Sequence, residues 1–276
     1  MSYLEFYKLE EHPFSISFDN RFYFNSKQHS DALVRLKHAV AHQTGLAVLV
    51  GGTGTGKTTL ARRLLDELGD EDFESALLIV IHAAISSEWL LRKIATQLGV
   101  SEPAQDKTEL LTQLYERLVE IHEAKKKAVV LIDEAQMLQN KEVMEEFRGI
   151  LNIETDSHKL LTIVLFGLPD LDQCLALDEP LKNRISIRCE LQTFTENTTE
   201  EYVRHRLEVA GCARELFSED AYGIIHKYSG GIPRLINTIC DNALLEGFLQ
   251  KNESINSEIV REVAQDLKIA AEPRSS

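Results

Sequence analysis

The chain has 276 residues, of which 43% are hydrophobic, so it can bury a large core in one domain or in two unequal ones. Its net charge of −14 lacks the basic excess expected of a dedicated nucleic-acid-binding protein. The four cysteines are widely spaced, which argues against a disulfide framework. The N-terminus does not read as a signal peptide, and no apolar stretch approaches the ~18 residues of a transmembrane helix. We therefore expect a soluble, cytoplasmic protein.

The first 30 residues are rich in aromatic side chains and show no regular periodicity. This composition predicts an ordered arm whose rings are covered by another part of the protein. After Asp31, the apolar positions Leu33, Leu36 and Val40 follow a helical spacing. The segment GLAVLV then forms a short apolar run bounded by glycines, which is typical of a buried parallel strand.

Further apolar runs alternate with helical patterns along the next 140 residues. Such alternation predicts βαβ units, and so an α/β fold with a five-stranded parallel sheet covered by helices on both faces. The predicted strands after GLAVLV are Ala76–His82, Ala128–Asp133, Leu160–Gly167 and Arg184–Leu191, and helical patterns include Glu88–Leu98 and Lys107–Glu123.

From Thr198 to about Leu267 the sequence shows only helical periodicity, in segments broken by AGC, SGGIP and KNES. We therefore predict a domain boundary near Thr193–Asn197. The predicted organisation is an arm over residues 1–30, an α/β domain over 31–195, a small all-α domain over 196–268 and a disordered tail over 269–276.

The segment VGGTGTGKTTLARRLL, Val50–Leu65, contains the pattern G-x-x-x-x-G-K-[ST] between a predicted strand and a predicted helix. Glycines let backbone N–H groups converge on phosphates, and the helix N-terminus adds its dipole. Lys57 can reach the β- and γ-phosphate oxygens, and the Thr58 hydroxyl can hold Mg²⁺. A glycine-rich turn that matches by chance is the alternative, but the context favours a nucleotide site. The predicted nucleotide-binding residues are Gly52, Thr53, Gly54, Thr55, Gly56, Lys57, Thr58 and Thr59.

An acidic pair, Asp133 and Glu134, ends the apolar run AVVLID. Asp133 would hold Mg²⁺ through its water shell, and Glu134 would orient and polarise the attacking water. Acidic residues after a strand also often cap the next helix, which is the structural alternative. The phosphate-binding pattern upstream favours the metal-binding and catalytic roles.

Together these motifs resemble the AAA+ ATPases, and more narrowly the ExeA/GspA-type ATPases of secretion and pilus assembly. The opening YLEFYKLEEHPFSISFDNRFYFNSKQHSDAL is similar to that family's N-terminal block, whose aromatic arm helps to enclose the adenine. DEAQ (Asp133–Gln136), GLPDL (Gly167–Leu171) and SGGIPR (Ser229–Arg234) follow in the family's order. The resemblance implies a cytoplasmic, Mg²⁺-dependent P-loop ATPase with a helical lid, which hydrolyses ATP and assists assembly of a secretion or pilus system.

Two arginines receive roles from this resemblance. Arg234 is similar to the sensor-2 arginine, which contacts the γ-phosphate from the lid. Arg184 lies where the family places its arginine finger, which reaches the nucleotide of a neighbouring subunit, and Arg188 is the competing candidate. A guanidinium suits both tasks because its planar fork matches phosphate oxygens, although an ordinary ion pair is the alternative for each. The resemblance therefore implies an ATP-dependent homo-oligomer.

One position departs from the family pattern. The fourth strand is followed in the family by a glutamine, a candidate sensor-1 residue, where this chain has Leu168. An apolar side chain cannot hydrogen-bond a γ-phosphate or the attacking water. Thr162 lies mid-strand and is a poor substitute. Hydrolysis could thus be slow, and a nucleotide-gated interaction switch is one alternative function.

A second alternative is an ATP-dependent DNA-binding regulator of transposition, because the target-selecting ATPases of transposons share this AAA+ subgroup. It predicts a salt-sensitive affinity for DNA, whereas the acidic net charge speaks against it. ExeA/GspA-type relatives usually continue into a transmembrane segment and a peptidoglycan-binding domain, and this sequence shows neither. We therefore expect no direct membrane insertion and a connection to the membrane through a protein partner.

Overall fold

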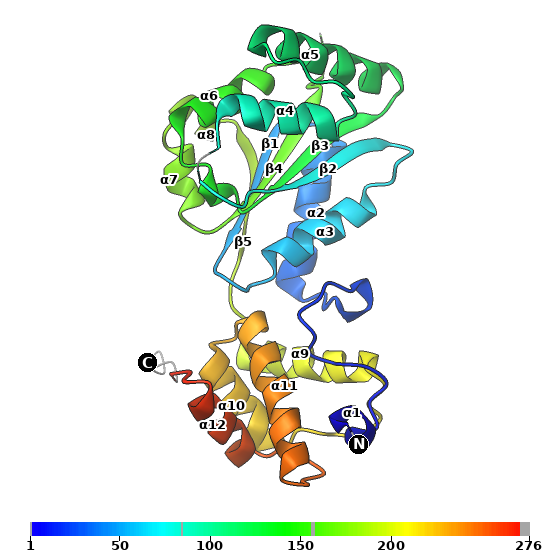
Figure 1. The fold of residues 1–276 in the computed structure, drawn as a ribbon, viewed down its shortest axis with the longest axis vertical. Helices are drawn as coiled ribbons and strands as arrows, with labels where there is room; N and C mark the ends of the chain where they lie inside the picture. Colours follow the sequence, from blue (N-terminus) through cyan, green and yellow to red (C-terminus); the bar gives the residue numbers. More distant parts are fainter. Residues whose placement is uncertain (1, 84, 156–157, 271–276) are drawn as a thin grey trace. The chain divides into compact units, whose positions relative to one another are not determined.

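The computed structural model describes residues 2–83, 85–155 and 158–270, and the chain divides into two compact units (Figure 1). The α/β unit comprises residues 27–52 and 57–191. The helical unit comprises the chain up to Ser26, the four residues Thr53–Gly56, and the chain from Gln192 onward. Of the predicted tail, 269–276, all but Ile269 and Ala270 lies outside the described residues.

The α/β unit is built on a five-stranded parallel sheet in the order β2-β3-β4-β1-β5. The central strands β1, β3 and β4 are almost completely buried, which explains why they appear in the sequence as continuous apolar runs. The predicted parallel sheet of five strands is confirmed. The strands are β1 Leu46–Gly51, β2 Phe73–Ile79, β3 Lys127–Asp133, β4 Leu161–Gly167 and β5 Ile185–Leu191.

Helices cover both faces of this sheet (Figure 1). On one face, the side chains of Leu46, Val48 and Val50 share a core with α4, α5 and α6, whereas α2 and α3 pack on the other face. Every helix within the described ranges is too short or too polar to span a lipid bilayer. The helices are α2 Lys27–Ala41, α3 Lys57–Glu67, α4 Ser87–Gln97, α5 Lys107–Glu123, α6 Lys141–Ile150, α7 Leu171–Leu175 and α8 Glu179–Lys182, with the 3₁₀ helix η2 Ala135–Met137 after β3.

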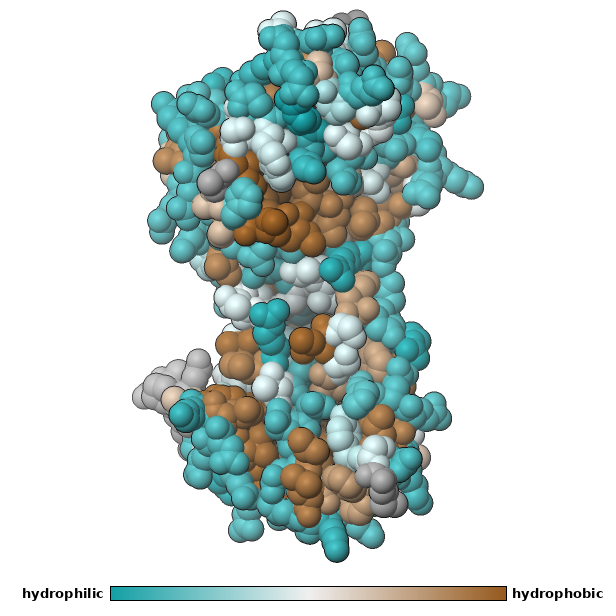
Figure 2. All heavy atoms as spheres, in the orientation of Figure 1, coloured by the Kyte–Doolittle hydropathy of each residue, from teal (hydrophilic) through white to brown (hydrophobic). Residues whose placement is uncertain are grey.

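The edge strand β2 is the element whose predicted bounds are wrong. The predicted strand Ala76–His82 begins three residues too late and ends three residues too late, because β2 pairs with β3 from Phe73 to Ile79. Beyond Ile79 the Val80 N–H still donates to the Asp133 carbonyl at 3.1 Å, and β3 ends at that residue. Ile79 and Ile81 are 45% and 80% exposed, and an apolar area is visible on the α/β unit in the region of β2 and α4 (Figure 2).

The aromatic arm completes the core of the helical unit. The ring of Phe6 packs edge-on against Phe248, with 5.5 Å between centroids, and Phe24 packs against Tyr202 at the same separation. These rings join a buried cluster with side chains from all four large helices. The elements of this unit are α1 Tyr3–Tyr7, the 3₁₀ helix η1 Asn20–Phe22, α9 Glu196–Val209, α10 Glu219–Ser229, α11 Pro233–Leu249 and α12 Ser257–Asp266.

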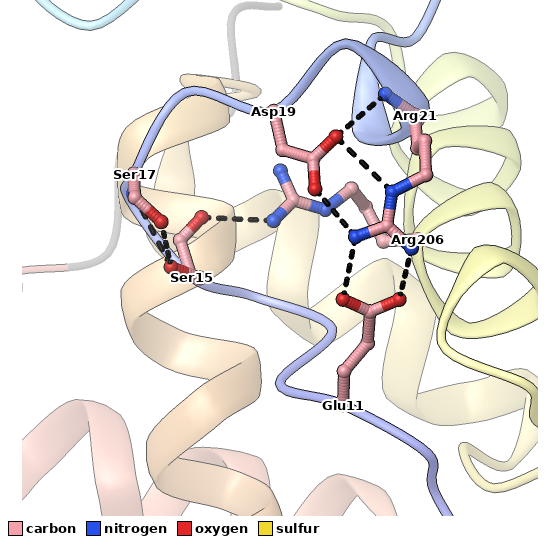
Figure 3. Close-up of polar contacts among 6 residues, drawn as sticks. All are labelled: Glu11, Ser15, Ser17, Asp19, Arg21 and Arg206. Atoms are coloured by element: carbon pink, nitrogen blue, oxygen red, sulfur yellow. Dashed lines mark hydrogen bonds and ion pairs between the residues drawn. The ribbon is translucent and has the colours of Figure 1, made fainter.

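Arg206 of α9 fixes the backbone of the arm (Figure 3). Its side chain is almost completely buried, and its Nε and Nη2 donate to the carbonyls of Pro13 and Ser15 at 2.5 and 2.8 Å. The guanidinium also lies 4.7 Å from the centre of the Phe22 ring. Buried carbonyls need a donor, so Arg206 satisfies backbone groups that the irregular arm cannot pair by itself.

A second arginine, Arg21, lies on the exposed side of the arm (Figure 3). It forms a bidentate ion pair with Glu11, with N–O distances of 2.7 and 2.9 Å, and a further ion pair with Asp19 at 2.6 Å. Exposed pairs of this kind contribute little to stability, since water solvates the separated charges well. The arm is therefore held mainly by its buried rings and by Arg206.

Candidate nucleotide-binding and active site

The glycines of the phosphate-binding pattern hold backbone conformations that other residues rarely adopt. Gly54 and Gly56 have φ angles of +78° and +102°. A Cβ atom at Gly54 would also lie 2.9 Å from Cβ of Arg234 and from Cγ2 of Ile232, all within the helical unit. The predicted sensor-2 residue Arg234 is the second residue of α11, and its backbone N–H donates to the Gly54 carbonyl at 3.3 Å.

Lys57 begins α3, and its ammonium lies against the start of the loop. Nζ donates to the carbonyls of Gly51 and Gly52 at 2.9 and 2.8 Å, and the residue is only 6% exposed. These contacts compensate the loss of water around a buried cation. The N-terminus of α3 adds a partial positive charge at the same place, so this end of the helix is suited to an anion.

Thr58 and Asp133 are far apart in the sequence but in direct contact in the fold. The Thr58 hydroxyl donates to Oδ2 of Asp133 at 2.6 Å. Thr58 lies in the first turn of α3, and Asp133 is the last residue of β3 and is 1% exposed. Hydroxyl and carboxylate oxygens are ligands that Mg²⁺ prefers. The predicted metal-binding pair is therefore chemically and geometrically suited to that ion.

Glu134 follows Asp133 in a left-handed backbone conformation, with φ 57° and ψ 35°. This conformation is uncommon for a residue other than glycine and is found often at functional sites. Glu134 precedes the short helix η2 without capping it through its side chain, so the alternative of a simple helix cap is not observed. Its half-buried carboxylate instead accepts a hydrogen bond from Nε2 of Gln136 at 2.6 Å.

Arg184, the predicted arginine finger, precedes β5 and lies at the opposite end of the strands from Lys57 and Asp133. β5 begins beside Leu46, the first residue of β1, whereas the phosphate-binding loop follows the last residue, Gly51. These two ends of β1 are about 17 Å apart at the rise of a strand, which is beyond the reach of an arginine side chain. Arg184 donates from Nη1 to the Arg148 carbonyl at 3.1 Å. It cannot serve the phosphate loop of its own chain.

Arg188, the competing candidate, already has an acidic partner. Its guanidinium forms a bidentate ion pair with Asp172 of α7, with N–O distances of 2.7 and 2.8 Å. A finger role for Arg188 would require this pair to break. Both arginines thus have a partner within their own chain, and the choice between them stays a prediction.

The end of β4 contains a contact that the sequence analysis did not anticipate. The Leu168 backbone N–H donates to Oε1 of Gln136 at 3.0 Å, so this position is linked to η2 through its backbone. Thr162 lies opposite Val129, about four residues or 13 Å from the end of β3, and cannot act at Asp133. In the sequence Gln136 appears only as the last residue of the DEAQ segment, and its burial and its two contacts are visible only in the structure.

Comparisons with known proteins agree with these motifs. A family model described as "AAA domain" matches residues 40–175. General secretion pathway protein A from Aeromonas hydrophila is 38% identical over 256 residues, which are 92% of this chain and 46% of that protein. This chain thus spans less than half the length of that relative.

Solved structures show the same fold at lower sequence identity. The Aeropyrum pernix ORC2 protein in ADPNP–ADP complexes has a TM-score of 0.68 and 16% identity, covering 93% of this chain and 72% of that one. Cdc6p from Pyrobaculum aerophilum has a TM-score of 0.69 and 20% identity, covering 92% and 70%. The sequence match along most of this chain and the AAA family model over residues 40–175 show that the chain contains an AAA domain and is similar to General secretion pathway protein A.

Proposed function

We propose that this protein is an Mg²⁺-dependent ATPase that hydrolyses ATP to ADP and phosphate. The observation that carries the proposal is the 2.6 Å contact between Thr58 and Asp133, with Glu134 next in the chain. This arrangement joins two oxygen ligands for a metal to a carboxylate that can act on water. Lys57 lies at the start of the same helix as Thr58.

Each residue of the site has a distinct task in this proposal. The loop backbone from Gly52 to Thr59 binds the phosphates, and Lys57 neutralises charge on the β- and γ-phosphate oxygens. Thr58 and Asp133 hold Mg²⁺, which when bound stabilises negative charge on the transferring phosphoryl group. Glu134 orients the attacking water and takes up its proton. By resemblance, Arg234 contacts the γ-phosphate and the aromatic arm helps to enclose the adenine.

The proposal is tested by phosphate release from ATP as a function of Mg²⁺ concentration. We expect release by the wild-type protein only with Mg²⁺, and we expect Thr58→Val to need about 10-fold more Mg²⁺ for half-maximal activity. Valine has nearly the same shape but no oxygen ligand, and a tenfold change corresponds to about 1.4 kcal/mol. Thr112→Val, on the exposed surface of α5, is the matched control. Wild-type protein that releases no phosphate would overturn the proposal.

We infer further that ATP drives assembly of a homo-oligomer in which Arg184 contacts the nucleotide of a neighbouring subunit. The position of Arg184, at the end of the strands away from its own phosphate-binding loop, supports this inference, since its side chain cannot reach that loop. The printed name of the 38% identical relative supports a role in secretion, with a protein partner from such a system, and pilus assembly is the other role that the resemblance implies. The alternative is a protein that assembles on DNA, and measuring assembly with and without DNA distinguishes the two functions.

Arg184→Ala is expected to reduce turnover at least about 10-fold while leaving the affinity for ATP unchanged. The reason is that an arginine finger stabilises the negative charge that develops in the transition state and not the bound ATP. Arg188→Ala removes only the pair with Asp172 and is expected to retain turnover. Light scattering on protein with MgATP, with and without duplex DNA, measures assembly in parallel. Unchanged turnover in Arg184→Ala would exclude the finger role, and assembly only on DNA would favour the regulator of transposition.

A further inference from the structure

Gln136 is a buried amide whose two ends contact two different parts of the active site. It is 6% exposed and lies in the middle of η2. Its Nε2 donates to Oε2 of Glu134 at 2.6 Å, and its Oε1 accepts the Leu168 backbone N–H at 3.0 Å. An amide that is taken out of water needs partners at both its oxygen and its nitrogen, and these contacts supply both.

The orientation of this amide follows from its neighbours. If oxygen and nitrogen exchanged places, the amide N–H₂ would face the N–H of Leu168 and the amide oxygen would face the carboxylate of Glu134. Both contacts would then join groups of the same kind, donor to donor and acceptor to acceptor. Only the observed orientation allows Gln136 to donate to Glu134.

The surrounding chain holds Gln136 firmly in place. The Cys174 thiol donates to the Gln136 carbonyl at 3.4 Å, and the Met137 N–H donates to the Glu134 carbonyl at 2.9 Å. At the end of β4, a Cβ atom at Gly167 would lie only 3.0 Å from Oε1 of Gln136, so the glycine leaves room for the amide. Gln136 is thus fixed to β4 and α7, and the carboxylate of Glu134 is fixed to Gln136.

We propose that Gln136 is a positioning residue for Glu134. Its Nε2 holds one carboxylate oxygen of Glu134, so that the other oxygen can face the attacking water. Because its Oε1 is bound to the backbone at the end of β4, the position of Glu134 is also tied to that strand. The inference rests on the proposed ATPase function, in which Glu134 acts on water. It also answers the question raised by Leu168, because the link from β4 to Glu134 uses the backbone N–H at 168 and does not depend on the side chain there.

The main test is Gln136→Leu, which keeps the size of the side chain and removes both hydrogen bonds. We expect kcat to fall about 10- to 100-fold, since a catalytic group displaced by ~1 Å can lose that much, while the Kd for MgATP stays within about twofold. Gln136→Glu keeps an acceptor for Leu168 but sets a second carboxylate against Glu134, and is expected to lose activity similarly. Gln139→Leu, at an exposed position three residues on, is the control and should keep wild-type turnover.

A double-mutant cycle separates positioning from general support of the fold. In the Glu134→Gln background, Gln136→Leu should cause no further loss in single-turnover hydrolysis at high protein concentration, because its effect passes through Glu134. A further loss equal to that in the wild-type background would overturn the positioning role, as would wild-type kcat in Gln136→Leu itself. An active wild type with an active Gln136→Leu contradicts only this inference, whereas an inactive wild type contradicts the proposed ATPase function as well.

Discussion

Glu134→Gln is expected to lower ATP hydrolysis at least about 100-fold while binding of MgATP stays close to wild type. General-base groups contribute about 10²- to 10⁴-fold to rate, and an uncharged amide cannot take up the proton of the attacking water. Glutamine has the size and shape of glutamate, and its amide oxygen can still accept from Nε2 of Gln136. The contact between Thr58 and Asp133 does not involve the replaced side chain.

Single-turnover phosphate release and equilibrium titration with a fluorescent ATP analogue measure the two quantities separately. Glu142→Gln, an exposed change of the same kind in the first turn of α6, controls for the lost charge and should hydrolyse ATP normally. If Glu134→Gln retained wild-type turnover, the base would lie elsewhere. If the wild-type protein turned over no faster than Glu134→Gln, the slow nucleotide-gated switch would become the better account.

Arg206→Ala should lower the free energy of unfolding of the helical unit by about 2–4 kcal/mol. The substitution removes the donors that satisfy the Pro13 and Ser15 carbonyls, and buried groups left without a partner cost about 1–3 kcal/mol each. It also removes the packing of the guanidinium against the Phe22 ring. Urea unfolding followed by circular dichroism measures the change, and the fluorescence of Trp89, the only tryptophan, follows the α/β unit separately.

Arg21→Ala is the matched control for this experiment. It removes the same side chain from the same arm, but Arg21 is 62% exposed and its ion pairs with Glu11 and Asp19 lie in water. We expect its unfolding midpoint to differ little from that of the wild-type protein. Equal midpoints for Arg206→Ala and Arg21→Ala would show that the buried contacts of Arg206 do not stabilise the arm.

The central strands and the phosphate-binding motif could be predicted from the sequence, because each depends on a local pattern of residues. β3 ends at Asp133 as expected, since the first acidic residue closes a run of buried side chains. The bounds of β2 were wrong because its first residues, Phe73, Glu74 and Ser75, are not an apolar run and owe their strand conformation to backbone pairing with β3. Pairing of this kind cannot be read from hydrophobicity.

The contacts around the active site were predictable only in part. The Thr58–Asp133 contact follows from a known pattern of motifs in parallel sheets. The contact of Gln136 with Leu168 joins residues 32 positions apart through a backbone group, so no side-chain pattern marks it. The family comparison drew attention to the Leu168 side chain, whereas the contact at this position involves its main chain.

The order of strands in the sheet has a consequence for synthesis on the ribosome. β1, which leads into the phosphate-binding loop, lies between β4 and β5, the last two strands of the α/β unit to emerge. Translation at about 5–20 residues per second leaves the apolar segment LAVLVG without either neighbour for roughly ten seconds. An unpaired apolar strand in a nascent chain is prone to aggregation and is a suitable target for chaperones. The nucleotide site, begun by the first strand, is therefore among the last parts of the α/β unit to be completed.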